Sequence, residues 1–258
     1  MTFRAMTKTL LEAAIRHDVK TIEPNAVAFI DQRQRQEAWF CYDLQLQWFL
    51  QTNSVDLVVD VGANEGQFGR RLRRVYAGDI ISFEPVSAAF EKLTTVADGD
   101  ARWTVYRGAI GSADATATIN VCSDTSFSSL LVPNEFSRAR FRRSTVESEE
   151  VVYVRRLEAV LMELVGRRIA DKRIFLKLDT QGCDLEAFKG IGTCAPYVHM
   201  MQSEVSLVPI YDGMPHWTKN IEAYEAAGFN IAGMFPVTRT KAGRVIEYDC
   251  LLVRDQSA

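Results

Sequence analysis

Two acidic residues and a pair of glycines form the part of this sequence best suited to ligand chemistry. Asp60 interrupts the apolar run over residues 57–61, and Glu84 ends a second apolar run 24 residues further along. Gly62 and Gly66 follow Asp60 and allow the backbone to approach a ligand closely. Carboxylates beside such a turn can accept hydrogen bonds from hydroxyl groups or face a positive charge. We therefore expect a nucleoside-containing ligand at this turn.

The elements that carry these residues follow from hydrophobic patterning. Residues 57–61 are nearly all apolar, as in a strand covered on both faces. We predict further strands, alternating with helical segments, over residues 79–83, 102–107, 174–178 and 198–204. The last two strands, over residues 229–237 and 246–254, should form an antiparallel hairpin. This order predicts an α/β fold with a doubly wound, mostly parallel seven-stranded sheet, in which ligands bind at the carboxyl ends of the strands.

Two further regions flank or interrupt this alternation. Residues 1–55 are expected to form a helical N-terminal extension or cap, with Leu10 and Ile15 on one helical face, and residues 56–258 the ligand-binding domain. Residues 112–154 break the βα rhythm and are expected to form an insertion over the carboxyl edge of the sheet. The helix after the glycine turn should end at Gly78, and Pro85 should open the next helix.

Composition narrows the class of protein. The chain has 258 residues, 47% of them hydrophobic, and a net charge of −3, which disfavours nucleic-acid binding. Its five cysteines form no Cys-x-x-Cys pair and its three histidines have no zinc-site spacing. No stretch approaches the ~20 apolar residues of a membrane span, and the first 20 residues carry charges unlike those of a signal peptide. We therefore expect a cytoplasmic protein with reduced thiols and no membrane span.

The glycine spacing favours S-adenosylmethionine over a dinucleotide. Gly62, Gly66 and Gly69 do not form the Gly-x-Gly-x-x-Gly pattern that holds a pyrophosphate, and Glu65 would oppose a phosphate. A sulfonium ligand carries positive charge, so Asp60 could meet its cation or amino group, or only brace the turn. Glu84 could accept hydrogen bonds from both ribose hydroxyls, or cap the following helix. The residues expected at the cofactor are Asp60, Gly62, Ala63, Asn64, Gly66, Glu84, Pro85, Ala109 and Ser128.

The chain resembles the FkbM family of S-adenosylmethionine-dependent methyltransferases over about residues 44–254. The matching segments are residues 59–66, 83–85, 126–130, 175–186, 202–206 and 209–211. Gln181 stands where the family often has glutamate, which argues against a role for this position as a base or metal ligand. The resemblance implies a class I, Rossmann-like methyltransferase that methylates a hydroxyl of a sugar, glycoside or secondary metabolite.

Methyl transfer to a hydroxyl requires in-line alignment and a group that takes the proton. Asp179 ends the predicted strand 174–178 and is expected to be this base or to orient the acceptor. Lys177 shares its side of the strand and should pair with an acid or with the acceptor, and Glu204 ends the next strand. Asp179 and Glu204 could also bind magnesium, but two acids are too few to predict a metal, and none is assigned.

The acceptor is expected to be a small molecule bound by polar loop residues. Candidates for this contact are Ser126, Ser129, Gln181 and His216, and Ser128 could serve the cofactor or a polyhydroxylated acceptor. The arginines over residues 138–143 form a solvated helix face or bind a phosphate-bearing acceptor. Oligomeric state is left open, with a homodimer allowed.

Two other functions compete with this interpretation. A nicotinamide-dependent oxidoreductase would use the same sheet, but the pyrophosphate motif is missing. A methyltransferase fold kept only as a binding module would not need intact Asp60, Gly62 and Glu84. Binding of S-adenosylmethionine or of NAD separates these alternatives.

Overall fold

The structure is a computed structural model, and it describes residues 40–254. Contacts divide the chain into two units, Met1–Phe40 and Cys41–Ala258. The helical face predicted around Leu10 and Ile15 lies outside the described residues, and a helix over residues 40–52 is the first described element.

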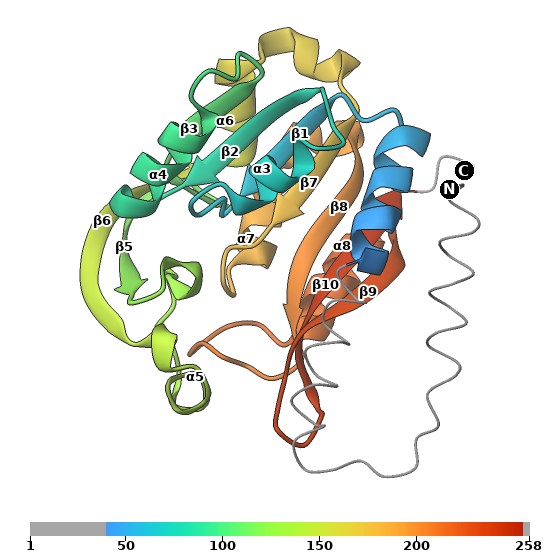
Figure 1. Ribbon diagram of the computed structural model, residues 1–258. Helices are drawn as coiled ribbons and strands as arrows, with labels where there is room; N and C mark the ends of the chain where they lie inside the picture. Colours follow the sequence, from blue (N-terminus) through green and yellow to red (C-terminus); the bar gives the residue numbers. More distant parts are fainter. Residues whose placement is uncertain (1–39, 255–258) are drawn as a thin grey trace, which may run out of the picture. The chain divides into compact units, whose positions relative to one another are not determined.

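A seven-stranded sheet forms the centre of the larger unit (Figure 1). The strand order is β3-β2-β1-β7-β8-β10-β9, and β10 runs antiparallel to both of its neighbours while the other pairs are parallel. This confirms the predicted doubly wound, mostly parallel sheet with one antiparallel strand near its edge. The strands are β1 (Leu57–Val61), β2 (Asp79–Glu84), β3 (Trp103–Arg107), β7 (Ile174–Leu178), β8 (Val198–Ser206), β9 (Phe229–Arg239) and β10 (Val245–Arg254).

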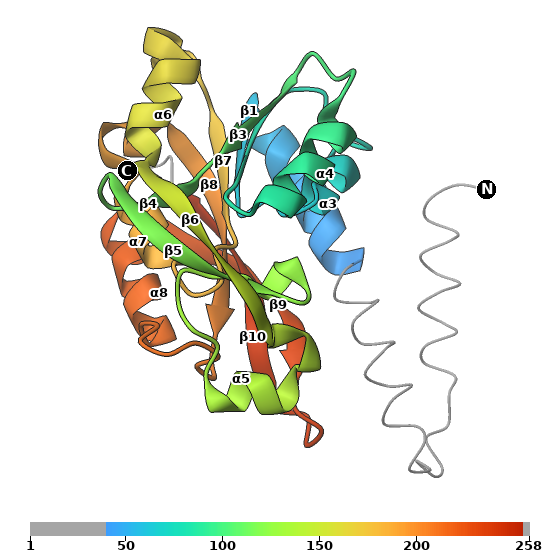
Figure 2. The same ribbon diagram turned by 90° about the vertical axis from the view of Figure 1, so that its left-hand side faces the viewer.

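Helices cover both faces of this sheet (Figure 2). One face carries α3 (Gln67–Leu72), α4 (Ser87–Ala97) and the helix over residues 40–52; the other carries α6 (Leu157–Leu164), α7 (Asp184–Lys189) and α8 (Trp217–Ala226). Within β1, Val58 packs in the apolar core on the face covered by α3 and α4. Val59 and Val61 pack in the core on the opposite face, which α6, α7 and α8 cover. Burial on both faces explains why β1 is apolar apart from Asp60.

The insertion is built around a second, three-stranded sheet in the order β4-β6-β5. Its side chains reach the loops at the carboxyl edge of the main sheet: Thr125 Oγ1 donates to Asn64 Oδ1 (2.7 Å) and Ser129 Oγ donates to the carbonyl of Gln181 (2.7 Å). The elements of this region are β4 (Ala109–Gly111), β5 (Ala115–Cys122), η1 (Thr125–Phe127), α5 (Glu135–Arg140), η2 (Arg142–Ser144) and β6 (Val146–Arg156). Two further 3-10 helices, η3 (Gly166–Asp171) and η4 (Gly192–Tyr197), lie outside the insertion.

Two predicted helix boundaries were wrong. Helix α3 ends at Leu72 and does not continue to Gly78. The Arg73 side chain binds Asp100 (2.6 Å) and the carbonyl of Gly78 (2.6 Å), which stabilises a turn in place of another helical turn. Pro85 precedes α4 instead of opening it, because Val86 is extended and its N–H donates to Glu84.

Candidate functional site

The turn after β1 fits only a glycine at its first position. Gly62 has φ +81°, and a Cβ at this residue would lie 1.9 Å from the carbonyl oxygen of Asp179. The N–H groups of Gly62 and Ala63 both donate to the carbonyl of Phe83, at 3.0 and 2.9 Å. The turn is therefore held between the end of β2 and the end of β7, where the predicted cofactor residues lie.

Glu84 lies buried beside this turn and binds it directly. One carboxylate oxygen accepts from the N–H of Asn64 and the other from the N–H of Val86, each at 2.8 Å. Burial raises the pKa of Glu84 to about 7, against the effect of these two hydrogen bonds. Each oxygen keeps a second lone pair for a ligand hydroxyl. Both of the roles predicted for Glu84 therefore fit its position: it binds the N–H that precedes α4, and it can still accept from a ribose.

A buried ion-pair chain joins β1 to the end of β7. Lys177 Nζ lies 3.1 Å from Asp60 and 3.2 Å from Asp179, and over the ring of Phe68. Burial lowers the pKa of Lys177, but Asp179 and Asp60 outweigh this effect and the net shift is upward. The predicted pairing of Lys177 with acids is confirmed. Asp60 itself has no exposed surface, so its predicted contact with the cofactor stays a prediction.

Gln181 joins the two candidate catalytic carboxylates. Its Nε2 donates to Asp179 Oδ1 (2.9 Å) and to Glu204 Oε2 (2.8 Å), while its Oε1 accepts from Tyr211 OH (2.7 Å). The backbone of Gln181 is left-handed, with φ +54°. Asp179 directly follows β7 and Glu204 lies within the neighbouring β8, and both carboxylates are bound to one amide nitrogen.

Further acids surround Glu204. Asp249 on β10 lies directly opposite Glu204 on β8 in the strand register. Glu247 lies two residues before Asp249, on the same face of β10. Burial raises the pKa of Glu247 to about 7 and that of Asp249 to about 6. Burial also raises the pKa of Glu204 well above its ordinary value. The sequence interpretation missed Glu247 and Asp249, although two acids spaced i and i+2 within an apolar strand were a visible signal.

Within residues 40–254, no group of three or more His, Cys, Asp or Glu side chains is arranged to hold a metal ion. Asp184 illustrates another role for a buried acid. It accepts from the N–H of Thr180 (2.8 Å), from Ser203 Oγ (2.7 Å) and from the N–H of Glu204 (3.1 Å). It therefore braces the start of α7 against β8.

The remaining predicted residues have local roles in the structure. Ser128 Oγ accepts from the N–H of Cys122 (3.1 Å), and Ala109 is buried in the core of the insertion. Ser126 binds Asp124 in an exposed turn (2.7 Å), and the exposed His216 caps α8. Among the described residues, no hydrogen bond links Ser126 or His216 to Gln181 or to the residues that Gln181 binds. Their contact with an acceptor therefore stays a prediction.

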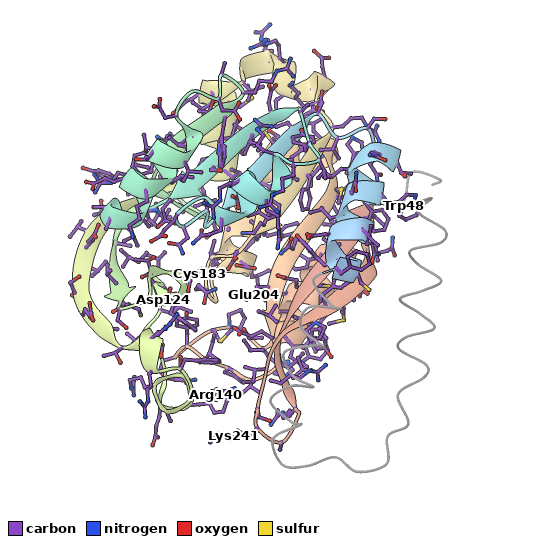
Figure 3. All side chains as sticks on the ribbon, viewed as in Figure 1. Trp48, Asp124, Arg140, Cys183, Glu204 and Lys241 are labelled. Carbon is purple, nitrogen blue, oxygen red and sulfur yellow. The ribbon has the colours of Figure 1, made fainter. Side chains whose placement is uncertain are left out.

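Three of the arginines in residues 138–143, namely Arg138, Arg140 and Arg143, are held by nearby protein atoms. Arg140 donates from α5 to the carbonyl of Arg239 (2.7 Å), and Arg143 pairs with Asp124 (3.3 Å). Figure 3 shows Arg140 towards the β9–β10 hairpin, and Glu204 and Cys183 nearer the ends of the sheet strands. The phosphate-binding role considered for these arginines stays a prediction.

Comparison with known proteins identifies the family to which this chain belongs. The model of the methyltransferase FkbM domain matches residues 60–231, more than half of the chain. No curated protein matches the sequence.

Within the part of the chain that the structure describes, no helix is long and apolar enough to cross a membrane, and all five cysteines are free.

Several solved structures are similar to this chain at low identity. Fibrillarin from Aeropyrum pernix, with natively bound S-adenosyl-L-methionine, is 11% identical with a TM-score of 0.44. The match covers 77% of this chain but 66% of fibrillarin, slightly under two thirds. Magnesium protoporphyrin IX methyltransferase from Synechocystis, with bound SAM, is 10% identical with a TM-score of 0.42, and the match covers 87% and 83% of the two chains. Both TM-scores are below 0.5, so the fold assignment rests on the strand order and the family match.

Proposed function

This chain belongs to the methyltransferase FkbM domain family and has a class I, Rossmann-like fold, and on that basis we propose that it is an O-methyltransferase. Its methyl donor is S-adenosylmethionine, and its proposed acceptor is a hydroxyl of a sugar, glycoside or secondary metabolite. The observation that supports oxygen as the acceptor atom is the pair of carboxylates, Asp179 and Glu204, beside the glycine turn. A hydroxyl must lose its proton, and such carboxylates can receive it.

The residues around the turn fit the cofactor. Gly62 lets the turn pack against the backbone of Asp179 at the end of β7, and Glu84 has free lone pairs beside this turn. We assign Glu84 to the ribose hydroxyls and the turn over residues 62–66 to the rest of the nucleoside and its methionine part. The cofactor supplies a methyl group on a sulfonium, whose departure needs no acid.

The protein residues supply alignment and proton acceptance. Lys177 pairs with Asp179 at 3.2 Å and holds its carboxylate in place. Asp179 and Glu204 together orient the acceptor hydroxyl, and this pair of carboxylates provides the group that receives its proton. The insertion, bound to the loops of the main sheet through Thr125 and Ser129, shields this reaction from water. Metal ions are not needed for this scheme.

The proposed acceptor is a small molecule, and the five free cysteines support a cytoplasmic site of action. The test is transfer of a ¹³C-methyl group from labelled S-adenosylmethionine to a panel of sugars, glycosides and phenolic or polyketide hydroxyl compounds, with and without magnesium. The proposal expects an O-methyl product, identified by its ¹³C chemical shift. Methylation at nitrogen or carbon alone, in a panel that includes amines, would contradict it.

A further inference from the structure

We propose that Gln181 is a positioning residue that sets the proton affinity of Glu204, and that Glu204, and not Asp179, takes the proton of the acceptor. This inference rests on the proposed O-methyl transfer, because it divides the work between the two carboxylates of that reaction. It differs from a direct contact between Gln181 and the acceptor, since the Gln181 amide acts through Glu204.

The Gln181 side chain has no hydrogen-bonding group left over. Its two amide hydrogens serve Asp179 and Glu204, and its oxygen accepts from Tyr211. Its backbone carbonyl accepts from Ser129 of the insertion (2.7 Å), which holds the residue in a left-handed conformation. A flipped amide would aim its oxygen at two carboxylates, so the orientation is fixed by its partners.

The two carboxylates differ in what binds them. Asp179 accepts from Gln181 on one oxygen and from Lys177 on the other, so both of its oxygens already have a donor. Glu204 accepts from Gln181 at Oε2, and within residues 40–254 its Oε1 receives no hydrogen bond. Glu204 therefore has the free oxygen that can take a proton, whereas Asp179, with a donor already on each oxygen, orients the acceptor.

The surroundings of Glu204 raise its affinity for a proton, and Gln181 opposes them. Burial is the largest cause of the raised pKa of Glu204, followed by its acidic neighbours. Lys177 is already paired with Asp60 and Asp179. The titratable groups that face Glu204 are Glu247 and Asp249 on β10, Asp179 after β7, Asp184 at the start of α7 and Tyr211 after β8. The Gln181 N–H stabilises the ionised form and brings Glu204 towards the pH at which a base works well.

The chemical step balances without another reactant. The acceptor oxygen forms a bond to the methyl carbon as the carbon–sulfur bond breaks and its electron pair returns to sulfur. The hydroxyl proton moves to Oε1 of Glu204. Solvent later takes this proton and restores the carboxylate.

The test is a direct titration of Glu204 in the full-length protein by NMR, with ¹³C label at the glutamate carboxyl carbons. The signal of Glu204 is identified by its loss in Glu204→Gln. Gln181→Met removes the amide donor while nearly conserving length, so it should raise the titration midpoint of Glu204 by about one pH unit, as loss of a hydrogen bond to a charged group implies. Tyr211→Phe is the matched control: it loses its bond to Gln181 but leaves both N–H donors in place, and its midpoint should equal that of wild type.

An unchanged midpoint in Gln181→Met, or a wild-type Glu204 that stays protonated up to pH 9, would overturn the inference. Where Gln181→Met does not fold, Gln181→Glu replaces it, because it also removes both donors and adds an acid; the same upward shift is expected and its absence has the same meaning. Binding of S-adenosylhomocysteine is measured in parallel. Wild-type protein that does not bind it would contradict the proposed function, while the NMR midpoints alone decide the role of Gln181.

Discussion

At the residue scale, Glu84 is the group whose assignment is tested most simply. If it accepts hydrogen bonds from the ribose, Glu84→Ala should weaken S-adenosylhomocysteine binding by about 1.5–3 kcal/mol, the range for hydrogen bonds to a charged group. Isothermal titration calorimetry measures this loss. Glu91→Ala, an exposed change on the neighbouring α4, is the control and should leave the affinity unchanged. A loss of only a few tenths of a kcal/mol in Glu84→Ala would remove Glu84 from the cofactor site.

The raised pKa of Glu84 gives the same interaction a pH dependence. Its pKa is about 7 in the free protein, and hydroxyl groups that donate to the carboxylate favour its ionised form. Binding should therefore release a proton below pH 7, and affinity should fall as pH decreases, by roughly tenfold between pH 7 and pH 5.5. Calorimetry in two buffers of different ionisation enthalpy measures the proton release. Glu84→Gln should abolish this dependence, and an equally steep fall in that variant would assign it to another group.

Asp179 is expected to act on turnover and not on the cofactor. Asp179→Asn removes a charge that orients the acceptor but keeps a similar shape, so kcat should fall by about 10²-fold. Affinity for S-adenosylhomocysteine should change by less than about threefold, which is below 1 kcal/mol. Steady-state kinetics with an acceptor from the screen and calorimetry give the two values. Equal losses in both would make Asp179 a cofactor contact.

The sequence was enough to find individual acids but not the connections between them. Asp60, Lys177 and Glu204 are charged residues within or at the ends of apolar strands, which is a local and visible pattern. The bridging role of Gln181 depends on a left-handed backbone and on Tyr211, 30 residues further along the chain. Neither feature leaves a periodic signal in the sequence, so the bridge could be seen only in the structure.

At the element scale, the junction between β1 and β7 depends on Gly62. Gly62→Ala would add a Cβ at φ +81° and 1.9 Å from the carbonyl oxygen of Asp179, so strand ends must separate. We expect a loss of about 2–4 kcal/mol in the free energy of unfolding, which combines left-handed strain with overpacking. Urea denaturation measures it. Gly99→Ala is the matched control, since Gly99 has φ +79° but open space around it, and it should cost only about 1 kcal/mol. Equal losses in the two variants would mean that the strand ends can yield.

Element boundaries were predictable where they depend on hydrophobic runs and local caps. Strand β7 has the predicted limits, Ile174–Leu178. The end of α3 was not predictable, because Arg73 is held by Asp100 from the loop before β3. The register of β10 against β8 could not be predicted from the sequence either. This register places Asp249 opposite Glu204.

At the scale of the whole larger unit, the sheet and the insertion together make the proposed enzyme. The carboxyl ends of β1, β2 and β7 provide the glycine turn, Glu84 and Asp179, and the insertion binds this edge through Ser129 and Thr125. The strand order explains why residues that are far apart in sequence meet here, since ligands bind where neighbouring connections leave a sheet in opposite directions. Family membership identifies the chain as a methyltransferase. The carboxylates of Asp179 and Glu204 support the proposal that the acceptor atom is oxygen.

The central claim is that this protein binds S-adenosylmethionine at the turn after β1. The most direct test is isothermal titration of the full-length protein with S-adenosylhomocysteine, with NAD and NADP titrated under the same conditions. We predict micromolar binding of S-adenosylhomocysteine at one site per chain and no binding of either dinucleotide. Binding of NAD or NADP without binding of S-adenosylhomocysteine would contradict the account and with it the roles assigned to Glu84, Asp179 and Glu204.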